Sequence, residues 1–191
     1  MRSPGKSAFV ASFAVLVAAA PLLAQGAQGK AAPHVADRTF LLGAASAGLE
    51  QVRLGRLALL KAANADVKSL AQQLVDGHSK INDQLRQLAA SKGLGGIQAH
   101  PDRSTQRVYD QFDKLSGDDF DVAYVQRLVE DHLHEVAEFA NAAQRAADAD
   151  VRQFAASALP SLQDDLKTAK ALESEIAGRA SRHLGPGTKG R

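Results

Sequence analysis

Two histidines occupy positions at which the helical repeat of the sequence calls for a hydrophobic side chain. His78 lies in LVDGHSKI and shares one helical face with Leu74 and Ile81. His132 lies in LVEDHLHEV, on a similar apolar stripe of a later helix. An imidazole on an inner helix face can ligate a metal ion, or it can form hydrogen bonds within the core. The spacing alone leaves both interpretations open.

Two carboxylates are candidates to complete a metal site with these histidines. Glu135 follows His132 by three residues and borders the same face, and Asp165 falls on the apolar stripe of the last predicted helix. Two imidazoles with one or two carboxylates suit zinc, iron or manganese. In the alternative, each histidine is neutral, hydrogen-bonds to a neighbouring carboxylate and fixes helix register. No Glu-x-x-His is present, which argues against a conventional di-iron centre.

The residue composition excludes several classes of active site. The chain has 191 residues, which suggests one domain, and no cysteine. Thiolate catalysis, disulfides, zinc–thiolate sites and iron–sulfur clusters are therefore ruled out. A Gly-x-Ser-x-Gly motif is also absent, and no basic stripe with interleaved aromatic residues supports nucleic-acid binding. The composition does not favour an enzyme, and it predicts no particular cofactor.

The first 24 residues have the pattern of a cleaved secretory signal. Arg2 and Lys6 form a positive start, an apolar run extends from Ala8 to Leu23, and small residues follow. An uncleaved anchor is the alternative, but the run is short for a membrane span. Without residues 1–24, the 23 basic residues fall to 21, which equals the number of acidic residues. We expect an exported protein of the periplasm or outer cell envelope, with no membrane span after cleavage.

The remaining sequence reads as one helical domain with flexible ends. Residues 25–36 are rich in Gly, Ala and Gln and are expected to form a flexible lead-in, and the tail 183–191 is expected to be disordered. Between them, residues 37–182 contain four long apolar stripes separated by the short breaks AANAD and ADAD and by one longer connector. This connector spans about 93–117, and its segment STQRVYDQFDKL predicts a short helix.

The two short breaks belong to an internal repeat with an offset of 84 residues. AANADVK, which starts at Ala62, matches AADADVR, which starts at Ala146. Two similar helical hairpins joined by a long connection have the connectivity of ferritin-like bundles. A helix of about 26 residues is about 39 Å long, which the connector can span. We therefore predict an all-α, ferritin-like four-helix bundle whose long crossover contains a short helix, with Asp37 and Asp66 as N-caps of its first two helices.

Three segments resemble the bacterial domain of unknown function 4142 family. They are VKSLAQQLVDGHSK, LSGDDFDVAYVQRLVEDHLHEV and VRQFAASALPSLQDDLKTAKAL, and the resemblance extends from about Phe40 to Leu172. The resemblance implies an exported or outer-membrane protein with a ferritin-like fold and no settled activity. The chain departs from the family pattern at two places: Gly77 stands where an acid is expected, and no histidine follows the Leu-Pro at Pro160.

Two functions from different classes fit these observations. The favoured one is a non-enzymatic envelope domain that binds a small ligand or another envelope protein. A role in the stress response is one form of this function. The rival is a metal-binding protein or metalloenzyme that uses His78, His132, Glu135 and Asp165 between helices. The first helix has a thin stripe of glycine and alanine, which suits close approach of a partner helix and therefore also a homodimer.

Overall fold

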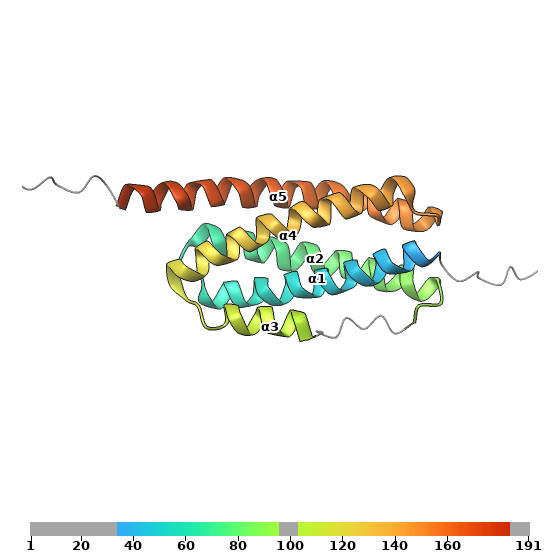
Figure 1. Ribbon diagram of the computed structural model, residues 1–191, viewed down its shortest axis with the longest axis horizontal. Helices are drawn as coiled ribbons and strands as arrows, with labels where there is room; N and C mark the ends of the chain where they lie inside the picture. Colours follow the sequence, from blue (N-terminus) through green and yellow to red (C-terminus); the bar gives the residue numbers. More distant parts are fainter. Residues whose placement is uncertain (1–33, 96–102, 184–191) are drawn as a thin grey trace, which may run out of the picture.

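The computed structural model describes residues 34–95 and 103–183 of the 191-residue chain, with side chains described up to residue 179. The described residues exclude the predicted signal, most of the lead-in, residues 96–102 of the crossover and the predicted tail after its first residue, His183, which ends α5. The described residues form five helices and no strand: α1 Val35–Lys61, α2 Ala65–Ser91, α3 Arg103–Phe112, α4 Gly117–Arg145 and α5 Ala149–His183 (Figure 1). Among them, none is both long and apolar enough to cross a membrane.

The long helices pair as two hairpins, α1 with α2 and α4 with α5, and the hairpins pack together through contacts of α2 with α5 and of α1 with α4. Figure 1 shows α3 alongside α1, within the connection that leads from the end of α2 to the start of α4 at the opposite end of the bundle. The predicted all-α, ferritin-like four-helix bundle, with a short helix in its long crossover, is therefore confirmed.

The bundle has two apolar core clusters with polar side chains between them. One cluster includes Leu70 and Phe120, and the other includes Leu85 and Phe139. Between these clusters along the helices lie five buried polar side chains, which we call the polar layer: Gln51, His78, His132, Glu135 and Asp165. All four long helices contribute to the polar layer. Burial of so many polar groups costs stability unless they are hydrogen-bonded or bind a ligand.

Each hairpin turn is held by a carboxylate from the other hairpin. Asp121 of α4 accepts hydrogen bonds from the backbone N–H groups of Ala63 (3.2 Å) and Asn64 (2.8 Å), in the turn between α1 and α2. At the other end of the bundle, Asp37 of α1 accepts from the N–H groups of Ala147 (3.0 Å) and Asp148 (2.8 Å). The two carboxylates and their partners are related by the same 84-residue offset, so the repeat extends to tertiary contacts.

The predicted N-caps of the first two helices are wrong. Asp37 lies inside α1, which begins two residues earlier, and its carboxylate binds the distant turn. The N-cap of α1 is His34, whose Nδ1 accepts a hydrogen bond from the N–H of Ala36 (3.3 Å). Asp66 also lies inside its helix, and its N–H donates to the side chain of the actual N-cap, Asn64 (2.8 Å).

A buried tyrosine lies where α1 and α2 approach closely. A Cβ at Gly55 would come within 2.7 Å of Val75 Cγ2 and 3.7 Å of the Tyr124 hydroxyl. Tyr124 is fully buried, burial raises its pKa, and its hydroxyl has no hydrogen-bond partner among the described residues. An unsatisfied buried hydroxyl costs free energy that a phenyl ring avoids.

We expect Tyr124→Phe to raise the free energy of unfolding by about 1 kcal/mol, because it removes an unsatisfied polar group and keeps the packing. Urea unfolding of this variant beside Tyr109→Phe, at a partly exposed ring, measures the change. A loss of stability in Tyr124→Phe alone would mean that the hydroxyl has a partner after all.

Candidate metal centre

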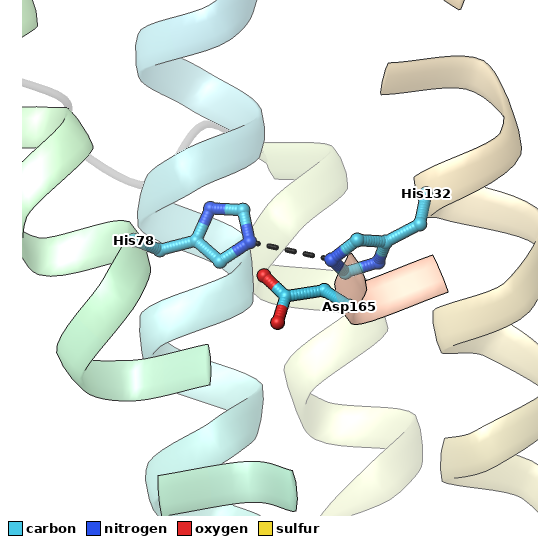
Figure 2. Close-up of side chains that lie close together, drawn as sticks. All are labelled: His78, His132 and Asp165. Carbon is cyan, nitrogen blue, oxygen red and sulfur yellow. Dashed lines mark hydrogen bonds between the residues drawn. The ribbon is translucent and has the colours of Figure 1, made fainter. Parts of the chain in front are cut away.

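Two imidazoles and one carboxylate from three helices converge inside the polar layer. Figure 2 shows a ring nitrogen of His78 (α2) pointing at a ring nitrogen of His132 (α4), with the Asp165 carboxylate (α5) beside the dashed line that joins them. The two Nε2 atoms are 3.4 Å apart, and one ligand atom from each of the three residues lies within 4.8 Å of the others. Both histidines are fully buried and Asp165 is 3% exposed. Residues that lie 54 and 33 positions apart in the chain thus form one compact group.

Hydrogen bonds to neighbouring groups orient two of these three side chains. His132 Nδ1 lies 3.0 Å from the carbonyl oxygen of Leu128, which can only accept, so the ring carries its proton on Nδ1. The lone pair of His132 Nε2 therefore points at His78. Asp165 Oδ1 accepts a hydrogen bond from Gln73 Nε2 (2.7 Å). Partners of this kind commonly orient metal ligands.

Burial keeps both imidazoles neutral. Burial lowers the pKa of His78 to about 3, and the neighbouring His132 adds to this shift. Burial also lowers the pKa of His132, although the Leu128 carbonyl and the Asp165 carboxylate oppose the shift. The pKa of Asp165 is raised by burial, against the effects of Gln73 and His132. Neutral imidazole is the form that binds metal ions.

Glu135, the fourth predicted ligand, lies on the other side of the His78 ring. Its Oε1 is 3.9 Å from His78 Nδ1, which is beyond hydrogen-bond length, and Nδ1 has no partner among the described residues. Glu135 is 6% exposed, and burial raises its pKa to about 8, with a further contribution from Asp131. The structure therefore groups three of the four predicted residues and places Glu135 next to them.

The fifth member of the polar layer, Gln51, was not predicted from the sequence. It is 2% exposed, its Nε2 donates to Asp131 (3.1 Å), and its Oε1 has no partner among the described residues. Gln51 follows Gly48 by three residues and precedes Gly55 by four, so its spacing places it on the inner face of α1. This spacing from Gly48 and Gly55 is the feature of the sequence from which the burial of Gln51 could have been predicted.

The separation of the two Nε2 atoms fits a tetrahedral metal ion. Two imidazole nitrogens at about 2.0–2.1 Å from a tetrahedral zinc ion lie about 3.3–3.4 Å apart. Adjacent ligands of a square-planar ion at similar bond lengths lie only about 2.8–2.9 Å apart. The observed 3.4 Å therefore allows a tetrahedral ion with little movement of the rings. Asp165 is close enough to supply an oxygen ligand to the same ion.

Comparison with solved structures gives three similar helical bundles. CopM in the Cu(II)-bound form has a TM-score of 0.62 and 14% identity, over 73% of this chain and 96% of that one. A DUF305 fragment from Deinococcus radiodurans has a TM-score of 0.65 and 12% identity, over 76% and 99%. A predicted secreted DUF305 protein from Streptomyces coelicolor has a TM-score of 0.62 and 14% identity, over 74% and 94%. At these identities the likeness shows the fold alone.

Comparison with curated proteins gives no significant match. The sequence pattern of one protein family, by contrast, matches residues 22–172, which is most of the chain and includes all five residues of the polar layer. This chain belongs to that family, the domain of unknown function DUF4142.

Proposed function

We propose that the chain is an exported, non-enzymatic metal-binding domain of the cell envelope that holds one divalent transition-metal ion between α2, α4 and α5. The observation that carries this proposal is the 3.4 Å separation of the two buried Nε2 atoms. His78, His132 and Asp165 supply the ligands. The N-terminal signal pattern and the secreted DUF305 neighbour support export.

The ligand set favours a zinc-like ion. Imidazole and carboxylate suit zinc, iron and manganese, and the nitrogen separation suits tetrahedral coordination. Copper(II) is the alternative, because it binds most nitrogen and oxygen sites more tightly and because CopM was solved in a Cu(II)-bound form. Among the described residues there is no methionine and no cysteine, so soft ligands for copper(I) are absent. We expect zinc(II) to be the best fit to the geometry.

The burial of the ligands favours binding over catalysis. The three ligand side chains are between 0% and 3% exposed, so an ion held by them would be enclosed by protein side chains. A catalytic metal needs an open coordination position that a substrate can enter. The proposed role is therefore to hold or carry the ion.

We expect the purified exported protein to bind about one zinc(II) ion per chain, because the described residues contain one such group of three ligands. His78→Ala combined with His132→Ala should weaken binding at least about 100-fold, since it removes both nitrogen ligands. Competition with a chromophoric chelator measures the affinity, and elemental analysis measures the stoichiometry. Titration with copper(II) tests the alternative ion.

His134→Ala is the matched control for this experiment. His134 lies on the same helix, two residues after His132, and its side chain is 78% exposed. This variant should bind zinc like the wild-type protein. Equally low metal content and affinity in all three proteins would contradict the proposed function and leave the histidine pair as a hydrogen bond that sets helix register.

A further inference from the structure

A cleft on the surface between α1, α3 and α4 leads toward the polar layer. Its volume is about 280 Å³. Carboxylates from α1 and α4 are prominent among its lining residues: Glu50, Asp131, Glu135 and Glu138. Arg127 also lines the cleft, but the acidic residues outnumber it, and an excess of one sign of charge raises the local concentration of ions of the opposite sign. The charge of this cleft therefore suits a cation.

The carboxylates of the cleft differ in their partners. Arg127 forms ion pairs with Glu50 (2.8 Å) and Asp131 (2.7 Å), and His134 lies 3.2 Å from Glu138. Glu135 instead has its Oε1 3.9 Å from Nδ1 of the neutral His78 ring. Glu135 is therefore the buried acidic residue of the cleft, and it lies beside a candidate metal ligand rather than beside an arginine.

Glu135 joins the cleft to the candidate metal centre. Its side chain lines the cleft, and its Oε1 lies 3.9 Å from His78 Nδ1. Because both ring nitrogens belong to one imidazole, Oε1 lies within about 6 Å of His78 Nε2. A carboxylate that only orients the ring would lie at hydrogen-bonding distance from Nδ1, and 3.9 Å exceeds that distance.

Two buried polar atoms on this side of the centre have no partner among the described residues. They are His78 Nδ1 and Gln51 Oε1, and the residues that carry them are 0% and 2% exposed. Gln51 lines the cleft together with Glu135. Buried polar atoms without partners are costly, so a role for them is expected. Here they would offer a nitrogen and an oxygen ligand to a cation that moves inward from the cleft.

On the opposite side of the candidate metal centre, a different side chain lies between the ligands and the solvent. There Asp165 is separated from solvent by Gln73, an exposed side chain whose Nε2 donates to Asp165 Oδ1 (2.7 Å). Displacement of Gln73 would open a second route between α2 and α5. At the mouth of that route lies the hydrogen-bonded amide of Gln73.

We propose that the metal ion reaches its ligands through the cleft between α1, α3 and α4, and that Glu135 is the transfer ligand that passes it from the cleft to His78 and His132. This inference rests on the proposed metal-binding function. It adds a direction of access and a role for Glu135 that is separate from equilibrium binding. A transfer ligand accelerates association and dissociation together, since it lowers one barrier that both processes cross.

Stopped-flow mixing of the purified exported protein with zinc(II) and a chromophoric chelator tests this route. Glu135→Gln keeps the shape of the side chain and removes its ability to lose a proton to an incoming cation. We expect this variant to slow both zinc association and zinc dissociation by about tenfold or more, with the dissociation constant within about threefold of wild type. Glu138→Gln, in the same cleft but on an exposed residue, should change both rates less than about twofold.

Gln73→Ala tests the opposite route and should leave the association rate within about twofold of wild type. Its dissociation rate is expected to rise, because Asp165 loses the hydrogen bond that orients it. Wild-type rates in Glu135→Gln, or a marked acceleration of zinc association in Gln73→Ala, would overturn the route through the cleft while leaving the binding function in place. A Glu135→Gln variant with weaker binding and an unchanged association rate would make Glu135 a ligand of the bound ion and would also overturn the transfer role. Absence of zinc binding by the wild-type protein would overturn the function and the route together.

Discussion

Replacing Asp121 with alanine is expected to lower the free energy of unfolding by about 3 kcal/mol, because two backbone donors lose a charged acceptor. Asp121 accepts hydrogen bonds from the N–H groups of Ala63 and Asn64, and it is 3% exposed. Burial raises its pKa, while the two backbone hydrogen bonds lower it, so they offset only part of the desolvation cost. Removal of the carboxylate also removes this desolvation cost. The expected loss of unfolding free energy is therefore smaller than the summed contributions of two charged hydrogen bonds.

Asp37→Ala should have an effect of similar size, because Asp37 makes the equivalent pair of hydrogen bonds at the other end of the bundle. The two sites are separated by nearly the whole length of α4, about 40 Å. Their effects should therefore add in the double variant to within about 0.5 kcal/mol.

Denaturant unfolding followed by circular dichroism measures these losses. Asp119→Ala is the matched control, since Asp119 is an exposed acid in the first turn of α4, two residues before Asp121. Its loss should be below about 1 kcal/mol, the size of a helix-terminus charge effect. Equal losses in Asp119→Ala and Asp121→Ala would show that the turn does not depend on the carboxylate.

Replacing His78 and His132 together by leucine is expected to separate folding from metal binding. The two histidines contact each other between two apolar core clusters, and leucine has a similar volume. Replacement of both partners of a buried polar pair by apolar side chains is commonly neutral or stabilising. We expect the metal-free double variant to be as stable as the wild type or more stable by about 1–2 kcal/mol.

With metal present, the order of stability should reverse. At a free zinc concentration of 100 times the dissociation constant, the wild-type protein gains about 2.7 kcal/mol from binding, whereas the leucine variant gains nothing. Thermal unfolding of both proteins with zinc and with chelator measures the two differences. A leucine variant that is much less stable than the metal-free wild type would show that the histidine pair serves the fold itself.

The fold could be predicted to a large extent because its signals are local. The breaks AANAD and ADAD, the apolar stripes and the glycine after Lys92 are each visible within a few residues. Gly93 adopts a φ of +76°, and the N–H of Leu94 bonds the carbonyl of Ala89 (2.9 Å), which is the helix ending that this sequence predicts. The role of Asp37 could not be predicted, because its partner turn lies 110 residues away.

The candidate site could be predicted only in part. The apolar stripes place His78 and His132 on inner faces, and both are fully buried. Their heights along the bundle depend on how the hairpins slide past each other, and that register is set by long-range contacts such as those of Asp121. The pattern of apolar residues in one sequence does not predict this register. Gln51 was missed because a glutamine among small residues resembles a surface position.

The 84-residue repeat has a consequence for how the site could arise. A dimer of two identical hairpins would carry every ligand twice, related by the symmetry of the dimer. In the single chain the positions that correspond to the three ligands hold residues that cannot bind metal: Gly48 for His132, Leu162 for His78 and Ile81 for Asp165. Fusion of the halves into one gene lets each half mutate on its own. The chain can therefore keep apolar packing in one copy of each position while the other copy acquires a ligand, which gives one asymmetric site per molecule.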